Sequence, residues 1–464
     1  MPDNIFQIKG PMNLLELQKA LGYEINKGGM CYGIAYMAIQ AIIRNDFDTY
    51  IDRINLLDEY MSKHNSEDAA IQNLVSDIKD AEAKRKNKHN LNSRDIKLLS
   101  IVAWLDGIQI YHGLDIVSLS TPCSYIEKFK HKLNINNPPP IFRYQSYNTG
   151  TNLFSGDIYE PDKTYLKSNK LCFLNESSIY SLFEEINSSN EPIAFSIGTD
   201  KHIIAIGKGM NTNIYLINHN KHRILQNKEA FYKYIKFAFN ESIHEIDKSI
   251  ISISKFSNEK CNSIDTIYDK NLPIEKVLFL AMLYGNTNAT KYYIKKILDS
   301  RKMNKVELLE AKGRNKYSPG FIFALMNSHL DTIEAYIIAI ANSDIINSYK
   351  ISLLAAIDIN NEPGLWHALY YNNIDAIGIY LKTINKNHAS NITKAIMNSS
   401  IDQKKLKDTL LKWALEYKPE MLKQRSEYPL LIEILSYNRS NIFKVSKTTS
   451  MKKFFDNRIY KMWN

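Results

Sequence analysis

The sequence predicts an α+β domain over residues 1–256 followed by an all-α repeat domain over residues 257–464. Three observations give this prediction: helical spacing of apolar residues before residue 119, short Ile-rich runs between residues 192 and 256, and a repeat of about 44 residues after residue 257. A chain of 464 residues has room for both parts, since domains average roughly 150 residues.

Composition excludes several classes of protein. Hydrophobic residues make up 44% of the chain and charged residues 23%, which is typical of a folded chain and excludes general disorder. No run of about 18 apolar residues and no basic-then-apolar leader occurs, so we expect neither a membrane span nor Sec-dependent secretion. Four dispersed cysteines form no disulfide framework and indicate a reducing compartment: Cys31, Cys123, Cys172 and Cys261.

The net positive charge of the chain comes entirely from its second half. Residues 257–464 hold 30 Lys and Arg against 20 Asp and Glu, a net +10, whereas residues 1–256 are neutral. The tail from Arg439 to Asn464 alone carries +6. We interpret this tail, and the basic cluster at 84–88, as solvated surface, although the tail leaves an acidic partner such as nucleic acid open.

The first 170 residues are predicted to be mainly helical. Residues 31–43 form a mainly apolar run without Pro or charge and follow Gly28 and Gly29, which predicts a buried helix entered through a tight turn. Apolar residues three and four apart continue the helical pattern to about Leu119. Three prolines at 138–140 and a polar stretch to Lys170 then indicate an irregular crossover.

Strands are predicted after this crossover. The runs 192–198, 202–207, 213–218 and 249–256 are short, rich in Ile and bounded by Gly, Asn or Lys. An antiparallel sheet that follows a helical layer gives an α+β domain ending near residue 256.

A repeat begins after residue 257. Three segments align on a small residue at Ala281, Ala324 and Ala368, with spacings of 43 and 44 residues. In each segment a short apolar helix leads to a turn and then to a second apolar helix, with the turns at Gly285, Ser328 and Asn372. We therefore predict two antiparallel helices per unit, with candidate further units near Trp413 and Tyr428.

One constellation in the first domain indicates nucleophilic catalysis. Cys31 opens the buried helix, His202 precedes an Ile-rich strand, and Asn218 ends the next strand. A thiol at a helix N-terminus lies beside the positive end of the helix dipole, which favours thiolate. We predict Cys31 as nucleophile, His202 as general base and acid, and Asn218 as the residue that orients the imidazole.

Such a site also needs donors to a developing oxyanion. The flexible glycines before Cys31 allow its backbone N–H to act as one donor. We predict Asn26 as the second donor, and Gln18 is a weaker candidate.

These residues resemble the three sequence blocks of papain-like cysteine proteases, especially the YopT-type bacterial effector peptidases. The matching blocks are Gly29-Met30-Cys31-Tyr32-Gly33, Lys201-His202-Ile203-Ile204-Ala205-Ile206 and Tyr215-Leu216-Ile217-Asn218-His219-Asn220. The third block departs from that family, because Asn218 replaces an Asp and His219 a Pro, although papain itself uses Asn. The glutamine usual before the nucleophile is missing, since Ile25 occupies its position.

The second half resembles the ankyrin repeat, although its period is longer than the usual 33 residues by about ten. The closest pieces are Ser318-Pro319-Gly320, Ala324, His329-Leu330-Asp331 and Ile333. The extra residues imply longer loops or an added turn, and a generic α-solenoid is the alternative. We predict that the partner-binding residues are His329, Asp331, Asn373 and Asp375.

A papain-like domain joined to ankyrin-like repeats resembles the ankyrin-repeat effectors that Legionella delivers into host cells by type IV secretion. They imply a monomeric cysteine hydrolase in the host cytoplasm, with the nucleus as an alternative, whose repeats bind a host protein. The same triad also serves deamidases, transglutaminases and acyltransferases, because each proceeds through a thioester. The alternative is a catalytically idle pseudoprotease that acts as an interaction module.

We predict neither a cofactor nor a metal site. His219 and His222 have the spacing of a metal-binding pair, but no Cys or carboxylate partner lies at suitable spacing in the sequence. We interpret this pair as loop polarity.

Overall fold

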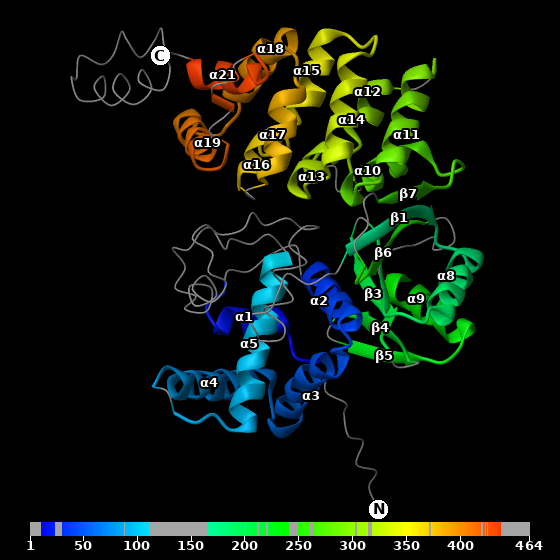
Figure 1. The fold of residues 1–464 in the computed structure, drawn as a ribbon, viewed down its shortest axis with the longest axis vertical. Coiled ribbons are helices and arrows are strands. Elements are labelled where there is room, and N and C mark those ends of the chain that lie inside the picture. The colour runs from blue at the N-terminus through cyan, green and yellow to red at the C-terminus, as the bar shows by residue number, and fades with distance from the viewer. Residues whose placement is uncertain are drawn as a thin grey trace, which may run out of the picture. The chain divides into compact units, whose positions relative to one another are not determined.

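The computed structural model describes residues 11–23, 30–87, 89–111, 165–199, 201–210, 213–219, 221–240, 249–259, 264–301, 304–313, 318–370, 373–418, 421–422, 424 and 426–437. These residues form helices and one mixed, seven-stranded sheet, so the protein combines both kinds of secondary structure (Figure 1). Among the described residues, helix length and hydropathy never combine to give a bilayer-spanning segment.

The chain divides into two compact units, residues 1–273 and 274–464. We predicted the boundary at residue 256 and expected no strand beyond it. Instead β7 (Asp265–Tyr268) adds to the sheet by pairing in parallel with β1 (Tyr165–Phe173), which keeps the chain in the first unit for longer. Each unit is described by itself below.

Five helices open the first unit. They are α1 (Leu14–Ala20), α2 (Cys31–Ile43), α3 (Phe47–Lys63), α4 (Glu67–Lys86) and α5 (Ser93–Tyr111). The predicted buried helix is α2, in which every residue from Gly33 to Ile43 is buried. Behind it, the rings of Tyr50 and Trp104 meet edge to face at 5.8 Å and join α3 to α5. Large aromatic side chains thus fill the core of the helical layer.

The sheet has the strand order β5-β4-β3-β2-β6-β1-β7. Its remaining strands are β2 (Ile193–Gly198), β3 (Ile203–Lys208), β4 (Ile214–Asn218), β5 (Lys221–Leu225) and β6 (Ile250–Ser257). The four predicted strands correspond to β2, β3, β4 and β6. Apart from the parallel β1–β7 pair, neighbouring strands are antiparallel, as predicted.

The two faces of the sheet carry different side chains. Large residues such as Phe195, Ile204 and Leu216 form one core with α8 (Glu176–Ser188) and α9 (Lys228–Asn240). Because side chains alternate along a strand, the other face of β2, β3 and β6 presents mostly small residues, namely Ala194, Ser196, Ala205, Gly207, Ser252 and Ser254. Helix α2 packs on that small-residue face, opposite α8 and α9 (Figure 1).

The second unit is an array of helices in which each repeat has three helices. First helices are α10 (Ile274–Tyr284), α13 (Gly320–Met326) and α16 (Gly364–Tyr370); second helices are α11 (Thr287–Asp299), α14 (Leu330–Ala341) and α17 (Ile374–Thr383). Third helices are α12 (Lys305–Glu310), α15 (Asn347–Ala355) and α18 (Lys386–Met397), and α19 (Gln403–Tyr417) and α21 (Pro429–Ser436) follow. Our prediction of two helices per unit was therefore wrong.

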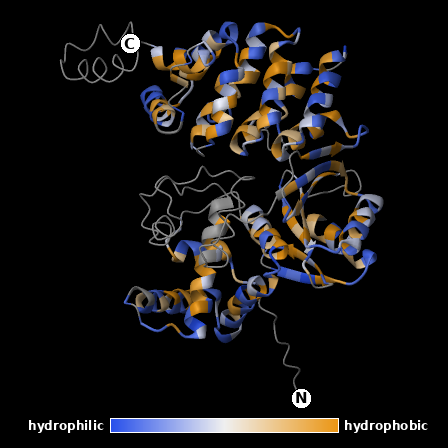
Figure 2. Ribbon diagram, in the orientation of Figure 1, coloured by the Kyte–Doolittle hydropathy of each residue, from blue (hydrophilic) through white to orange (hydrophobic). Residues whose placement is uncertain are grey.

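The repeat register was located correctly. Ala281, Ala324 and Ala368 all lie buried in first helices, and helices of the same rank stack on one another from repeat to repeat. The third helix occupies the extra residues of the period. Hydrophobic and hydrophilic residues alternate along these helices, as expected where each helix packs on neighbours and keeps one solvent face (Figure 2).

Buried tyrosines join successive repeats. Tyr336 on α14 donates its hydroxyl hydrogen to the Leu309 carbonyl of the preceding repeat at 3.0 Å. Tyr380 on α17 makes the same bond to Leu354 at 2.9 Å. Each acceptor lies at the end of a third helix, where backbone carbonyls lack partners within the helix. The tyrosines therefore complete the capping of these helices from the next repeat.

Removing one of these hydroxyl groups should weaken the array. We expect Tyr336→Phe to lower the free energy of unfolding by about 1 kcal/mol, because the Leu309 carbonyl loses its buried donor. Urea denaturation of the full chain, compared with wild type, measures the change. Tyr349→Phe is the matched control, since Tyr349 is 47% exposed; an equal effect of both substitutions would contradict the role of the bond.

Candidate active site

Cys31 is the first residue of α2 and is partly buried. The packing of α2 on β3 brings its sulfur to the backbone of Ile203, whose N–H hydrogen-bonds to the sulfur, as do the N–H groups of Tyr32 and Cys31 itself. Ile203 is the first residue of β3 and directly follows His202. The structure thus places the sulfur next to the backbone of the predicted catalytic histidine.

His202 and Asn218 meet through the register of the β3–β4 hairpin. Ala205 pairs with Ile217, so Asn218 lies one step further along, opposite Ile204. Residues two apart share a face of a strand, which makes His202 a diagonal neighbour of Asn218. Their side chains are joined by a hydrogen bond of 2.8 Å between His202 Nε2 and Asn218 Oδ1.

This hydrogen bond determines the protonation pattern of the imidazole. An amide oxygen only accepts, so Nε2 carries the hydrogen and donates it. In the neutral ring Nδ1 then holds the lone pair that a general base needs. The bond has the geometry that an orienting Asn would use, and the catalytic role of Asn218 stays a prediction.

Two further rings contact His202, and we predicted a role at the site for neither of them. His219 stacks on His202 with ring centroids 4.8 Å apart, and Phe239 of α9 approaches edge-on at 5.7 Å. His219 directly follows Asn218 and has a φ of 54°, a left-handed conformation that reverses the chain after β4. The signal in the sequence was the polar pair Asn218-His219, which directly follows the apolar residues of β4 and so places both side chains at the strand end.

The thiol differs from our expectation in its acid strength. Burial raises the pKa of Cys31 above its ordinary value of 9.0, and the hydrogen bonds from the N–H groups of Ile203, Tyr32 and Cys31 only partly oppose this effect. We predicted that the helix N-terminus would favour thiolate. Desolvation is the larger influence here, so the resting thiol is protonated at neutral pH.

The oxyanion donor that we predicted, Asn26, lies outside the described residues, as do Gly28 and Gly29. The weaker candidate, Gln18, is a fully buried residue of α1. Within the described part of the chain, neither atom of its amide group has a hydrogen-bond partner. The backbone N–H groups of Ile203, Tyr32 and Cys31 are the donors that the structure does place beside the sulfur.

The other polar motifs that we noted in the first unit interact with charged side chains of the same unit. His222 on β5 and Asp58 on α3 influence each other: burial lowers the pKa of His222 and raises that of Asp58, and their mutual attraction opposes both shifts. His219 and His222 therefore have different neighbours. In the basic cluster, Lys84 pairs with Asp95 at 2.8 Å. Cys172 is buried on β1, whereas Cys123, Cys261 and the basic tail lie outside the described residues.

Two of the predicted partner-binding residues are used inside the repeat array. The His329 ring lies against Gly285, where an added Cβ would come within 2.4 Å of it, and Nε2 lies 3.0 Å from the Leu283 carbonyl. Asn373 is fully buried and donates to the carbonyls of Leu325 and Met326. Our assignment of His329 and Asn373 to partner binding is therefore corrected: they connect repeats.

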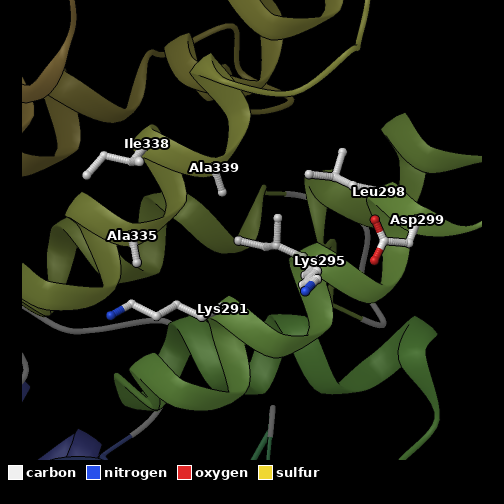
Figure 3. A pocket seen from close by; sticks show the side chains of 8 residues that line it. Lys291, Lys295, Leu298, Asp299, Ala335, Ile338 and Ala339 are labelled. Carbon is white, nitrogen blue, oxygen red and sulfur yellow. The ribbon is translucent and has the colours of Figure 1, made fainter.

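The other two residues have surface positions. Asp331 is exposed in the first turn of α14. Asp375 is partly exposed and lies 3.7 Å from Lys418. A hollow of about 330 Å³ also opens between α11 and α14, lined by Lys291, Ile294, Lys295, Leu298, Asp299, Ala335, Ile338 and Ala339 (Figure 3).

Comparison of the chain with protein-family models, curated proteins and solved structures finds no match in any of the three. The chemistry of the site itself is therefore the basis for the function proposed below.

The raised pKa of Cys31 should make its thiol slow to react with alkylating reagents. Because alkylation by iodoacetamide requires thiolate, we expect slow modification at pH 6 to 8 and a rate that keeps rising with pH instead of reaching a plateau near neutral pH. Mass spectrometry of the Cys31 peptide measures the rate. The same chain unfolded in urea is the control and should react faster at pH 8. Rapid modification of the native protein at pH 6 would contradict a protonated resting thiol.

Proposed function

We propose that the first unit is a papain-like cysteine hydrolase domain, with Cys31 as nucleophile, His202 as general base and acid, and Asn218 as the orienting residue. The observation that carries this proposal is the 2.8 Å bond between His202 Nε2 and Asn218 Oδ1, together with the hydrogen bond that the next residue, Ile203, makes from its N–H to the sulfur of the helix-opening Cys31. Cys31 opens a helix, His202 directly precedes β3 and Asn218 ends the adjacent strand β4, in the chain order of the resemblance.

The residues suit acyl transfer through a thioester. His202 Nδ1 takes the proton of the Cys31 thiol as the sulfur attacks a carbonyl carbon, and the carbonyl oxygen becomes an oxyanion. Donors at the start of α2 stabilise that oxyanion. His202 then gives the proton to the leaving group, which departs as the carbonyl re-forms. Water, activated by the same imidazole, cleaves the thioester and restores the thiol.

The raised pKa of Cys31 affects the first step. A buried, protonated thiol does not form a resting ion pair with His202, so proton transfer accompanies attack on the substrate. A substrate that makes good use of this site must therefore bring its carbonyl close to the sulfur before the thiol ionises. We infer that reactivity depends on substrate binding more than in a site with a preformed thiolate.

The second unit is proposed as the part that selects a host protein. Stacked helical repeats present extended surfaces that suit protein binding. The hollow between α11 and α14 is lined by apolar side chains together with Lys291, Lys295 and Asp299, and this net positive lining suits an acidic partner segment (Figure 3). The ankyrin assignment is kept only as a resemblance of the first two helices, because each repeat has a third helix. Delivery into a host cell rests on the resemblance alone.

A second function is favoured by the burial of Cys31. If the raised pKa reflects a thiol that never ionises, the first unit is an idle pseudoprotease and the whole chain acts as an interaction module. The two proposals differ in whether His202 affects the chemistry of the sulfur.

Labelling with an activity-based probe tests the hydrolase. We expect a peptidyl epoxide to add once to the full chain at pH 7, because this electrophile needs proton transfer from the imidazole. Labelling should disappear in Cys31→Ala and fall by about 10²-fold or more in His202→Ala. Asn218→Ala, which loses the orienting bond, should show a smaller loss. Intact-mass spectrometry measures each rate.

Cys172→Ala and His222→Ala are matched controls, since both residues belong to the same unit and lie outside the proposed triad. Both should label at the wild-type rate. Equal labelling of wild type and His202→Ala, or no labelling under conditions that modify papain, would overturn the hydrolase and support the interaction module.

A further inference from the structure

A second cluster of chemically active side chains lies in the second unit. Asp358 and Glu362 belong to the turn between α15 and α16, and His367 lies on α16. The turn is tightly held: the Asp358 N–H donates to the Glu362 carbonyl at 3.0 Å, and the Glu362 N–H donates to Asp358 Oδ1 at 2.8 Å. Ser400 fixes its tip by donating to the Asn360 carbonyl at 2.7 Å. The two carboxylates thus have defined positions.

The three side chains converge. His367 Nε2 lies 3.3 Å from Asp358 Oδ2 and 3.9 Å from Glu362 Oε2, and one donor atom from each residue lies within 4.8 Å of the others. The Asp358 side chain is only 4% exposed, that of His367 18% and that of Glu362 34%. The site is therefore enclosed on the Asp358 side and open to solvent beside Glu362.

The imidazole gives an independent indication of a ligand. Nε2 of His367 is buried, yet it makes no hydrogen bond to any described atom, although Asp358 Oδ2 is only 3.3 Å away. In an ordinary His–Asp pair the N–H would be directed at the carboxylate oxygen. A buried polar atom without a partner is costly, and so are two carboxylates held close together. A cation between the three donors would relieve both costs.

We propose that Asp358, Glu362 and His367 bind a zinc ion, with water as the fourth ligand. One imidazole nitrogen and two carboxylate oxygens are donors that zinc accepts. Tetrahedral bonds of about 2.1 Å place donor atoms about 3.4 Å apart, and the two carboxylate oxygens lie 3.3 and 3.9 Å from His367 Nε2. The exposed side of Glu362 leaves room for the water. This site is independent of the proposed hydrolase function.

The position of the site indicates a structural role. Its ligands join the turn after α15 to α16, and Ser400 connects the same turn to the segment after α18. A metal ion there would fix the entry to the third repeat. The three ligands are spaced four and five residues apart, with Pro363 and Gly364 between the second and the third. This spacing matches none of the common metal-binding motifs, so our prediction of no metal site did not consider it.

Cobalt replaces zinc as a spectroscopic probe in the test. We expect titration of the full chain with Co²⁺ to give visible d–d bands that saturate at one equivalent and that Zn²⁺ abolishes. A ligand set without sulfur gives no thiolate charge-transfer band, which distinguishes this site from binding at Cys31. Equilibrium dialysis gives the affinity.

His367→Gln should weaken uptake by about tenfold or more. Glu362→Gln should also weaken it, and this partly exposed position keeps the test decisive if His367→Gln misfolds. His388→Gln on α18 is the matched control and should bind as wild type does. Failure to bind one equivalent of Co²⁺, or uptake that is unchanged in both His367→Gln and Glu362→Gln, would overturn the proposal.

Discussion

The close packing of α2 on the small-residue face of the sheet is the constraint on which the candidate site depends. Alanine, serine and glycine on β2, β3 and β6 leave room for a helix that is itself buried nearly all round. This packing brings the first residue of α2 to the first residue of β3. A larger side chain at Ala205, near the centre of that face, would push the helix away and separate the Cys31 sulfur from the Ile203 N–H.

The opposite face explains why the histidine is held so firmly. Large aliphatic and aromatic residues from the strands pack with α8 and α9, and Phe239 continues that core up to the His202 ring. The hairpin register then fixes Asn218 beside the imidazole. The small-residue face thus positions Cys31, the aromatic core holds the His202 ring, and the end of β4 positions Asn218, so each supplies one constraint on the candidate site.

Much of this could be predicted because buried, Ile-rich strands and repeated Ala positions leave strong patterns in the sequence. Strand β1 could not be predicted, because its polar residues hide the strand pattern. One of them, Asn169, is buried and donates to Ser252 and Ser254 on the neighbouring strand. Such cross-strand bonds join residues more than 80 positions apart. The short helix α12 was missed because Leu309 is its only buried residue. Likewise, His329 and Asn373 look like surface turn residues until the carbonyls that they bond are known.

The thiol pKa was the least predictable property, because it results from two opposed effects of the same packing. A helix N-terminus favours thiolate, whereas the burial that places the sulfur there disfavours any charge. The sequence reveals the first effect and conceals the second, which depends on how tightly α2 meets β3. Burial also strengthens every electrostatic interaction that a substrate oxyanion would make in the site. The packing that makes Cys31 a weak acid at rest therefore also favours stabilisation of a charge that develops only when a substrate is bound.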